Sequence, residues 1–218
     1  MVIGLSETTK RFLEPDQQFL CVEGGIDQDV YDFFGQSVAD EQQHEEGITT
    51  YMYAGILEPV TGVDMLLKSF DQISNPSVRL KISGKGSFQK LVEDAAKQDD
   101  RITYLGCVPY EEYLCNLKQA DILVNPRNMN LPENENNFPS KIMEYLATGK
   151  PIISTRFPGW EKYNEYITFC ESTVEGLQTA LAAADVGRDR AKAQRKFAES
   201  FLWVNQVKKI HRLLLEKS

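Results

Sequence analysis

The chain has 218 residues, of which 42% are hydrophobic and 26% are charged, and its formal net charge at pH 7 is −8. This composition is typical of a soluble globular protein and supplies enough apolar residues for a sizeable core. The negative charge argues against a nucleic-acid-binding surface, because phosphate backbones are bound by clustered Lys and Arg. No apolar run approaches the roughly 18 residues of a membrane span.

The four cysteines are spread along the chain, at positions 21, 107, 115 and 170. Their spacing contains no Cys-x-x-Cys pair and no histidine stands close to them, so neither a zinc site nor a disulfide framework is predicted. Reduced thiols fit a cytoplasmic location best. We expect no metal and no cofactor.

The first 48 residues give weak structural signals. A helix-like piece at 6–13 is followed by a strand-like piece at 19–22 and by the glycine pair Gly24-Gly25. The segment 40–47 is polar and acidic, which predicts an interdomain linker or a solvated helix.

From Thr49 onward, short apolar runs alternate with helical patterns, which is typical of a parallel sheet with crossover helices. The expected strands are residues 50–54, 78–83, 102–105, 122–125, 151–154 and 167–170. The expected helices are residues 63–73, 87–98, 110–118, 139–148 and 174–184. We therefore predict an α/β fold, a Rossmann-like doubly wound parallel sheet with helices on both faces. Such a sheet binds ligands at the carboxyl ends of its strands.

Gly84-Lys85-Gly86 follows the second expected strand and opens a helix. Two glycines let backbone N–H groups approach a phosphate, and the N-terminus of the helix adds favourable partial charge. A tight turn between strand and helix needs the same residues, so phosphate binding and a purely structural role both stay open.

The helix at 139–148 is the clearest local signal. Pro139 suits the first helical position, because its missing N–H would be unpaired there, and Gly149 can adopt the left-handed conformation that ends a helix. Ser140, Lys141 and Glu144 share one face of this helix. That face can contact a ligand.

The last stretch, residues 189–217, has a helical pattern with apolar residues on one face and Lys and Arg on the other. Packing against the core with a solvated rim is the simpler interpretation. A basic amphipathic helix on an anionic membrane is the alternative.

Residues 137–146, Asn-Phe-Pro-Ser-Lys-Ile-Met-Glu-Tyr-Leu, resemble the second half of the Glu-x7-Glu region of glycosyltransferase family 4, whose members are retaining enzymes of the GT-B fold. In that family the later glutamate binds the ribose of a nucleotide-sugar donor, and Glu144 matches it. Asn136 stands in the place of the earlier glutamate, which contacts the transferred sugar. The motif resembles that of bacterial members that build surface polysaccharides, and the resemblance extends over residues 51–181.

The chain departs from the family after its first strand. The family normally has Gly-Arg-Leu and then Lys-Gly there, and this Arg and Lys neutralise the donor diphosphate. In this chain Ile56 and Thr61 stand in those two positions. The resemblance therefore implies that other cations stabilise the leaving group, and the candidates are Lys85, Arg127 and Lys141. For Arg127 and Lys141, surface ion pairs with nearby carboxylates are the alternative.

The resemblance also implies that Val108 packs against the nucleotide base, and a buried strand end is the alternative. The loop 128–137 is long, polar and rich in Asn, which predicts a lid, a segment that contacts the sugar, or a disordered loop. The residues expected to contact the donor are Glu144, Lys141, Ser140, Arg127, Gly84, Lys85, Gly86, Val108, Asn136 and Phe138. No catalytic residue is assigned, because the usual catalytic histidine of the family belongs to the N-terminal domain, and neither His44 nor His211 matches it.

The resemblance implies the C-terminal, donor-binding half of a GT-B enzyme. Residues 1–35 are then a remnant of the N-terminal acceptor domain, 36–48 an acidic linker, 49–187 the nucleotide-sugar-binding domain and 188–218 a C-terminal amphipathic helix. The expected reaction transfers a sugar from a UDP- or GDP-type donor to a glycan or lipid-linked acceptor in polysaccharide biosynthesis, in the cytoplasm or at the inner face of the membrane. Without the N-terminal GT-B domain as its partner, the chain is expected to be inactive.

Two other functions compete with this one. A non-catalytic GT-B-like binding or scaffolding domain with a decayed donor site is the alternative, because the Arg, the Lys and the first Glu of the family pattern are absent. A nicotinamide-dependent oxidoreductase is disfavoured, because no Gly-x-Gly-x-x-Gly opens the first crossover.

Overall fold

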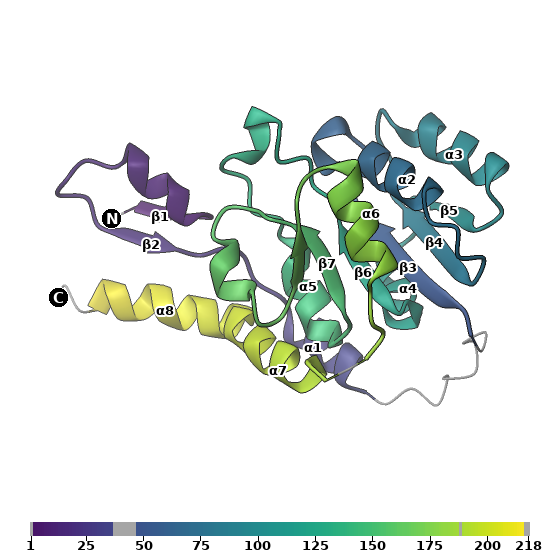
Figure 1. Cartoon of the computed structure of the whole chain (residues 1–218). Coiled ribbons are helices and arrows are strands. Elements are labelled where there is room, and N and C mark those ends of the chain that lie inside the picture. Colours follow the sequence, from purple (N-terminus) through teal and green to yellow (C-terminus); the bar gives the residue numbers. More distant parts are fainter. Residues whose placement is uncertain (1, 37–46, 188, 216–218) are drawn as a thin grey trace.

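The computed structural model describes residues 2–36, 47–187 and 189–215. Six parallel strands form the main sheet, in the order β5-β4-β3-β6-β7-β8 (Figure 1). Their bounds are β3 (Thr49–Ala54), β4 (Val78–Ser83), β5 (Ile102–Gly106), β6 (Ile122–Asn125), β7 (Ile152–Thr155) and β8 (Thr168–Cys170). The predicted doubly wound parallel sheet is confirmed, and each predicted strand agrees with the observed one to within one residue at either end.

The helices that connect these strands are α2 (Val63–Asp71), α3 (Gln89–Gln98), α4 (Tyr110–Gln119), α5 (Lys141–Thr148) and α6 (Val174–Ala182). Two further helices, α1 (Gln28–Gly35) and α7 (Ala191–Ala198), precede and follow this series. The predicted end of α5 is confirmed, since Gly149 has φ +69° and ψ +18°. The helix begins two residues after Pro139, at Lys141.

Helices cover both faces of the sheet (Figure 1). Alternate side chains of a strand point to opposite faces, and in β3 Met52 and Ala54 pack with α1, α4, α5 and α7, whereas Tyr51 and Tyr53 pack with α2, α3 and α6. None of these four residues is more than 3% exposed. Burial on both faces is typical of a parallel sheet, and all four residues of β6 and all four of β7 are buried.

A second, two-stranded sheet lies at the end of the molecule away from β5 (Figure 1). It pairs β1 (Val2–Gly4) in parallel with β2 (Phe19–Cys21), and the 3-10 helix η1 (Glu7–Phe12) connects them. The strand-like and helix-like pieces expected near the N-terminus correspond to β2 and η1, but β1 and α1 were not predicted. Of the expected acidic linker at 36–48, residues 37–46 lie outside the described part of the chain.

The helical pattern expected over 189–217 is divided into α7, the 3-10 helix η6 (Glu199–Phe201) and α8 (Trp203–Leu215). The division has a tertiary cause. The N–H of Ile26 donates to the carbonyl of Phe201 at 2.9 Å, and the N–H of Trp203 donates to the carbonyl of Ile26 at 3.1 Å. These two bonds hold Leu202 in an extended conformation between the helices.

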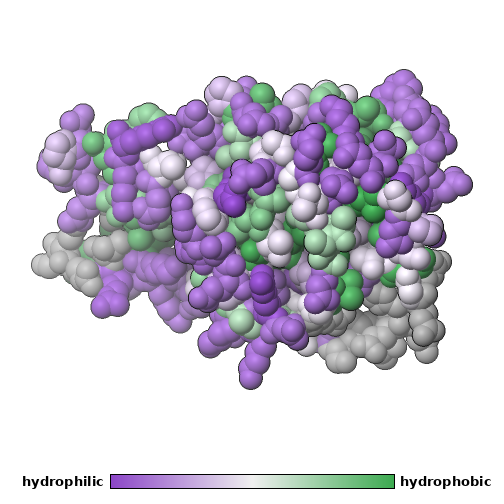
Figure 2. Space-filling view, viewed as in Figure 1, coloured by the Kyte–Doolittle hydropathy of each residue, from purple (hydrophilic) through white to green (hydrophobic). Residues whose placement is uncertain are grey.

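The apolar face expected on the C-terminal helix is buried in its first part only. Phe201 is 4% exposed, whereas Val204, Val207 and Leu214 of α8 are more than half exposed. Hydrophilic side chains cover most of the face seen in Figure 2, with hydrophobic areas between them. No helix in the described ranges has the length and apolar character needed to cross a membrane.

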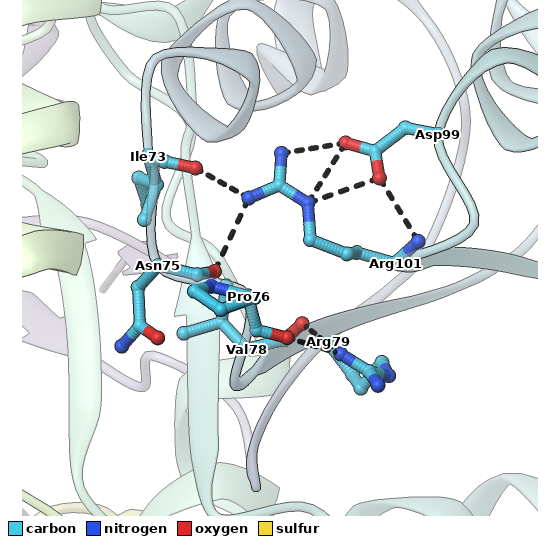
Figure 3. A network of polar contacts seen from close by, with 7 residues as sticks. All are labelled: Ile73, Asn75, Pro76, Val78, Arg79, Asp99 and Arg101. Carbon is cyan, nitrogen blue, oxygen red and sulfur yellow. Dashed lines mark hydrogen bonds and ion pairs between the residues drawn. The ribbon is translucent and has the colours of Figure 1, made fainter.

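Arg101 ties the beginning of β5 to the turn between α2 and β4 (Figure 3). Its guanidinium donates to the carboxylate of Asp99 at 2.7–3.1 Å, to the carbonyl of Ile73, and to the carbonyl of Asn75 at 3.3 Å. The hydrogen bonds from Arg101 hold the pKa of Asp99 below its ordinary value. This network stabilises the edge of the sheet at the amino ends of its strands.

We expect Arg101→Met to lower the free energy of unfolding by about 1–3 kcal/mol, because it removes charge-assisted hydrogen bonds from partly buried groups. Since the pKa of Asp99 is lowered in the folded state, its contribution is present above the pKa of the unfolded carboxyl and is lost as the pH falls through the folded value. Urea unfolding at about pH 7 and about pH 3 measures both parts. A loss of the same size at both pH values would contradict the ionic part.

Candidate functional site

A cavity of about 410 Å³ opens at the carboxyl ends of β3, β4 and β5. The chain runs from β3 outward to β5 and then returns to β6, so the strand order reverses between β3 and β6. Open α/β sheets bind ligands beside such a reversal. The cavity is lined by Ala54, Gly55, Ile56, Ser83, Gly84, Lys85, Cys107, Val108, Tyr110, Tyr113, Lys141 and Glu144.

Two turns meet closely at one wall of the cavity. A Cβ on Gly84 would lie 1.7 Å from the carbonyl oxygen of Gly55, and a Cβ on Gly86 would lie 2.3 Å from that of Leu57. The N–H of Gly55 donates to the carbonyl of Ser83, and the N–H of Leu57 donates to that of Lys85, both at 2.9 Å. Gly84 and Gly86 therefore have the structural role that the sequence left open, since only glycine allows the two turns to approach so closely.

The N-terminus of α3, beside this turn, already has a carboxylate. Glu58 accepts hydrogen bonds from the backbone N–H of Ser87 at 2.8 Å and from its hydroxyl at 2.5 Å. The hydroxyl and then the backbone N–H of Ser87 lower the pKa of Glu58. A phosphate at this helix end would have to approach an ionised carboxylate, which is electrostatically unfavourable.

Glu144 faces the cavity from the first turn of α5. Its carboxylate accepts hydrogen bonds from the phenol of Tyr110 at 2.9 Å and from that of Tyr113 at 2.5 Å, and the two rings stack with their centroids 5.7 Å apart. Burial and the charge of Glu144 raise the pKa of both phenols, so both stay protonated and donate. Because each carboxylate oxygen can accept more than one hydrogen bond, Glu144 retains capacity for a ligand.

Lys141 enters the same cavity from the beginning of α5. Its ammonium donates to the carbonyl of Ala54 and lies 4.8 Å from the centroid of the Tyr53 ring. Burial, and then the charge of Arg127, lower the pKa of Lys141 to about 8, although the charge of Glu144 acts in the opposite direction. Within the part of the chain that the structure describes, Lys141 forms no ion pair with a carboxylate. The pairing with Glu144 that the sequence left open is not formed.

Arg127 does not line the cavity. Its Nη1 donates to Oδ1 of the buried Asn134 at 2.7 Å and to the carbonyl of Asn137 at 3.4 Å. The expected alternative, an ion pair with Glu133 or Glu135, is also absent from the described residues. Arg127 thus holds the loop 128–137 in place.

Four other predicted residues lie outside the cavity wall, and they are Gly86, Asn136, Phe138 and Ser140. Phe138 is 8% exposed and packs edge-on against Phe157, with ring centroids 5.3 Å apart, so it belongs to the core. Asn136 is exposed on the loop, and Ser140 is exposed immediately before α5. The structure brings Glu144, Lys141, Gly84, Lys85 and Val108 together.

Tyr110 and Tyr113 are site residues that the sequence reasoning missed. They lie 34 and 31 positions before Glu144, and nothing local connects them to it. A signal was available in retrospect, since the two tyrosines stand three positions apart on the first turn of a helix that begins at the carboxyl end of a strand.

Ile56 and Thr61, at the two positions where the family has Arg and Lys, are joined by a hydrogen bond that closes the loop after β3. The carbonyl of Ile56 accepts hydrogen bonds from the phenol of Tyr53 at 2.7 Å and from the hydroxyl of Thr61 at 2.8 Å, while the side chain of Ile56 is 64% exposed. Among residues 2–36, 47–187 and 189–215, no group of three or more His, Cys, Asp or Glu is arranged to hold a metal ion.

Several solved structures are similar to this chain. HepE from Anabaena, in complex with UDP and glucose, superimposes with a TM-score of 0.76 at 16% identity, over 99% of this chain and 63% of that chain. A glycosyltransferase from Rickettsia africae gives 0.76 at 14% identity, over 98% and 62%. Sucrose-phosphate synthase from Thermosynechococcus elongatus gives 0.71 at 18% identity, over 99% and 58%. The chain thus spans less than two thirds of these structures, and it has their GT-B, Rossmann-like fold.

Comparison with curated protein sequences gave no match. The family model described as "Glycosyl transferases group 1" matches residues 49–184, which is more than half of the chain and includes every residue of the cavity wall. The chain belongs to the glycosyl transferases group 1 family.

Proposed function

We propose that the chain is the donor-binding part of a retaining glycosyltransferase, which transfers a sugar from a nucleoside diphosphate sugar to a glycan or lipid-linked acceptor. The observation that carries this proposal is the cavity at the carboxyl ends of β3, β4 and β5, in which the carboxylate of Glu144 and the half-buried ammonium of Lys141 face the same space. A carboxylate can accept hydrogen bonds from two vicinal ribose hydroxyls, and an ammonium can bind a phosphate.

The donor is proposed to be of the UDP type, with GDP as the alternative. HepE, which has the same fold, is bound to UDP in one structure, to UDP and glucose in a second and to UDP-glucose in a third. In this chain Val108 and Tyr110 line the cavity beside Glu144 and offer an apolar surface for a base. The base, the ribose and the diphosphate would then follow one another along the cavity from α4 toward β3.

The reaction breaks the bond between the anomeric carbon and the diphosphate oxygen and forms a bond from that carbon to an acceptor hydroxyl oxygen, whose proton is released. Negative charge gathers on the diphosphate as its bond breaks, so a fixed cation beside it lowers the barrier. Glu144, held by Tyr110 and Tyr113, would orient the ribose and thereby the sugar. Retention of configuration is proposed from the family resemblance, and no residue is assigned as a nucleophile or base.

The acceptor side is proposed to come from an N-terminal GT-B domain, on which the activity would depend. Polysaccharide biosynthesis in the cytoplasm, or at the inner face of a membrane, is proposed from the form of the motif around Glu144. Arg195 and Lys196 of α7 support binding to a membrane surface only weakly, because their side chains already have partners within the chain. Arg195 donates to the carbonyls of Ala147 and Tyr31, and Lys196 pairs with Glu199.

A non-catalytic domain with a decayed donor site is the second candidate. Two observations favour it. The hydroxyl of Thr61 donates to carbonyls within the loop after β3, and the carboxylate of Glu58 already accepts the N–H of Ser87, just before α3. Against it stands Glu144, whose carboxylate accepts hydrogen bonds from two phenols and lines the cavity. Nucleotide binding distinguishes the two, since a decayed site would bind neither UDP nor GDP.

We expect one of UDP and GDP to bind saturably to the chain, and Glu144→Ala to weaken that binding at least tenfold, about 1.4 kcal/mol, because the ribose hydroxyls lose their acceptor. Isothermal titration calorimetry measures both. Glu175→Ala, an exposed carboxylate on α6 at the other face of the sheet, is the matched control and should leave the affinity unchanged. Absence of binding by either nucleotide would reject the proposal and favour the decayed domain.

We expect Tyr113→Phe to weaken binding of the same nucleotide about 3- to 10-fold, because it removes one hydrogen bond that orients Glu144 while the ring remains. The nucleoside alone should lose affinity by the same factor, since Glu144 is proposed to contact the ribose. Tyr166→Phe, whose ring stacks on Phe197 away from the cavity, serves as the control. An unchanged affinity in Tyr113→Phe would show that the hydrogen bond from Tyr113 does not orient Glu144.

A further inference from the structure

The loop between β3 and α2 contains no cationic side chain. Its residues from Gly55 to Gly62 include Glu58 as the only charged one. A diphosphate placed beside this loop would meet the exposed side chain of Ile56 and the ionised carboxylate of Glu58. If the cavity binds a diphosphate, its counter-charge has to come from another element.

The ammonium of Lys141 lies against this loop. A Cβ on Gly55 would be 1.9 Å from Nζ of Lys141, and Nζ donates to the carbonyl of the preceding Ala54. The charge therefore sits at the carboxyl end of β3, one residue before Ile56. Gly55 has to be glycine for it to sit there.

The charge of Lys141 is incompletely neutralised. An ammonium has three donors, and for Lys141 the structure shows a carbonyl acceptor and the face of the Tyr53 ring. The charged groups around it are Arg127 from the end of β6 and Glu144 from α5, and Arg127 outweighs Glu144. A cation taken from water without an ionic partner is costly, so an anion bound here would relieve that cost.

Neither of the other two candidate cations is placed as well. Arg127 lies outside the cavity wall and is bonded to Asn134. Lys85 lines the cavity, but its side chain is exposed on the turn that leads to the N-terminus of α3, where Glu58 is bound. A solvated, flexible ammonium contributes less than a fixed one.

On the basis of the proposed function, we propose that Lys141 takes the place of the family's absent arginine and binds the diphosphate of the donor from the beginning of α5. The cation is thus supplied by the same helix that supplies the ribose-binding carboxylate of Glu144. This assigns to one short segment, Lys141 to Glu144, two of the contacts that define a nucleoside diphosphate.

The first test compares UDP with uridine, or GDP with guanosine if GDP is the nucleotide that binds, by calorimetry. Lys141→Met should weaken the diphosphate about 10- to 100-fold, as expected for a charge-assisted hydrogen bond, and should leave the affinity for the nucleoside within about twofold. Lys85→Met removes an equal charge from the same cavity and should cost the diphosphate less than about threefold. Without ligand, Lys141→Met should melt no lower than the parent chain, because it removes a half-buried cation that is repelled by Arg127.

The second test is a rescue. Ile56→Arg in the Lys141→Met background returns a cation to the position where the family has one, and should restore the affinity for the diphosphate to within about threefold of the parent chain. Ile56→Met in the same background has a side chain of similar length without charge, and should restore nothing.

The third test uses pH and separates charge from shape. The protonated form of Lys141 binds the anion, so the affinity of the parent chain for the diphosphate should fall as the pH rises through about 8 toward 9. The variant with Lys141→Met and Ile56→Arg should show no such fall, because a guanidinium stays charged throughout. Any titration of the nucleotide itself acts equally on both proteins.

Each possible outcome supports or overturns the proposal. If neither UDP nor GDP binds the parent chain, the proposed function fails, and this inference fails with it. If the diphosphate binds and Lys141→Met binds it equally well, the inference alone is overturned. If Lys141→Met weakens the nucleoside as much as the diphosphate, Lys141 acts on the ribose side or on the shape of the cavity, and phosphate binding by Lys141 is rejected.

Discussion

The close approach of the turns after β3 and β4 determines the geometry of the cavity. Because Gly84 has no side chain, its backbone lies against the carbonyl of Gly55, and the two strand ends meet without intervening side chains. Because Gly55 also has none, the ammonium of Lys141 can approach the backbone at the end of β3. The glycines thus provide space for a charge as well as a tight turn, and a Cβ at either position would have to displace one of these contacts.

Around this contact, the charges of the site are separated in an unusual way. Glu144 and Lys141 lie on the same turn of α5, at a spacing at which such residues often pair, yet each has other partners. The carboxylate is bound by two neutral phenols whose raised pKa keeps them protonated. The ammonium is bound by a carbonyl and a ring face. Since the two charges do not neutralise each other, both remain available to a ligand that carries hydroxyls and a phosphate.

The sequence predicted the parts of the molecule that local patterns determine. The six strands and Gly149 followed from apolar runs and helix stop signals, and Glu144, Lys141 and Gly84 followed from short motifs. The missed features depend on contacts between distant segments. Tyr110 and Tyr113 become site residues only through α5, and α7 and α8 are separated because Ile26 pairs with Leu202.

Phe138 is the opposite case, a residue that the motif placed at the site and that tertiary packing places in the core. Its neighbours in the sequence placed it near a ligand, but in the structure its ring joins Phe157 and Tyr163 in the core. A motif fixes the order of residues along the chain, while packing decides which side chains of that motif reach solvent. An aromatic ring beside two other rings is buried because burial of apolar area is favourable and edge-to-face contacts add to it.

The position of Lys141 is unfavourable for stability on three counts. It begins a helix, where the dipole favours negative charge, its ammonium is partly withdrawn from water, and Arg127 repels it. An apolar side chain of similar length would avoid all three costs. Glu144, by contrast, lies on the first turn, where its charge is favoured. The helix dipole therefore accounts for the carboxylate of this segment but not for the cation. A bound anion between the end of β3 and the first turn of α5 would offset all three costs at once, and this makes a ligand the simplest physical reason for a lysine at this place.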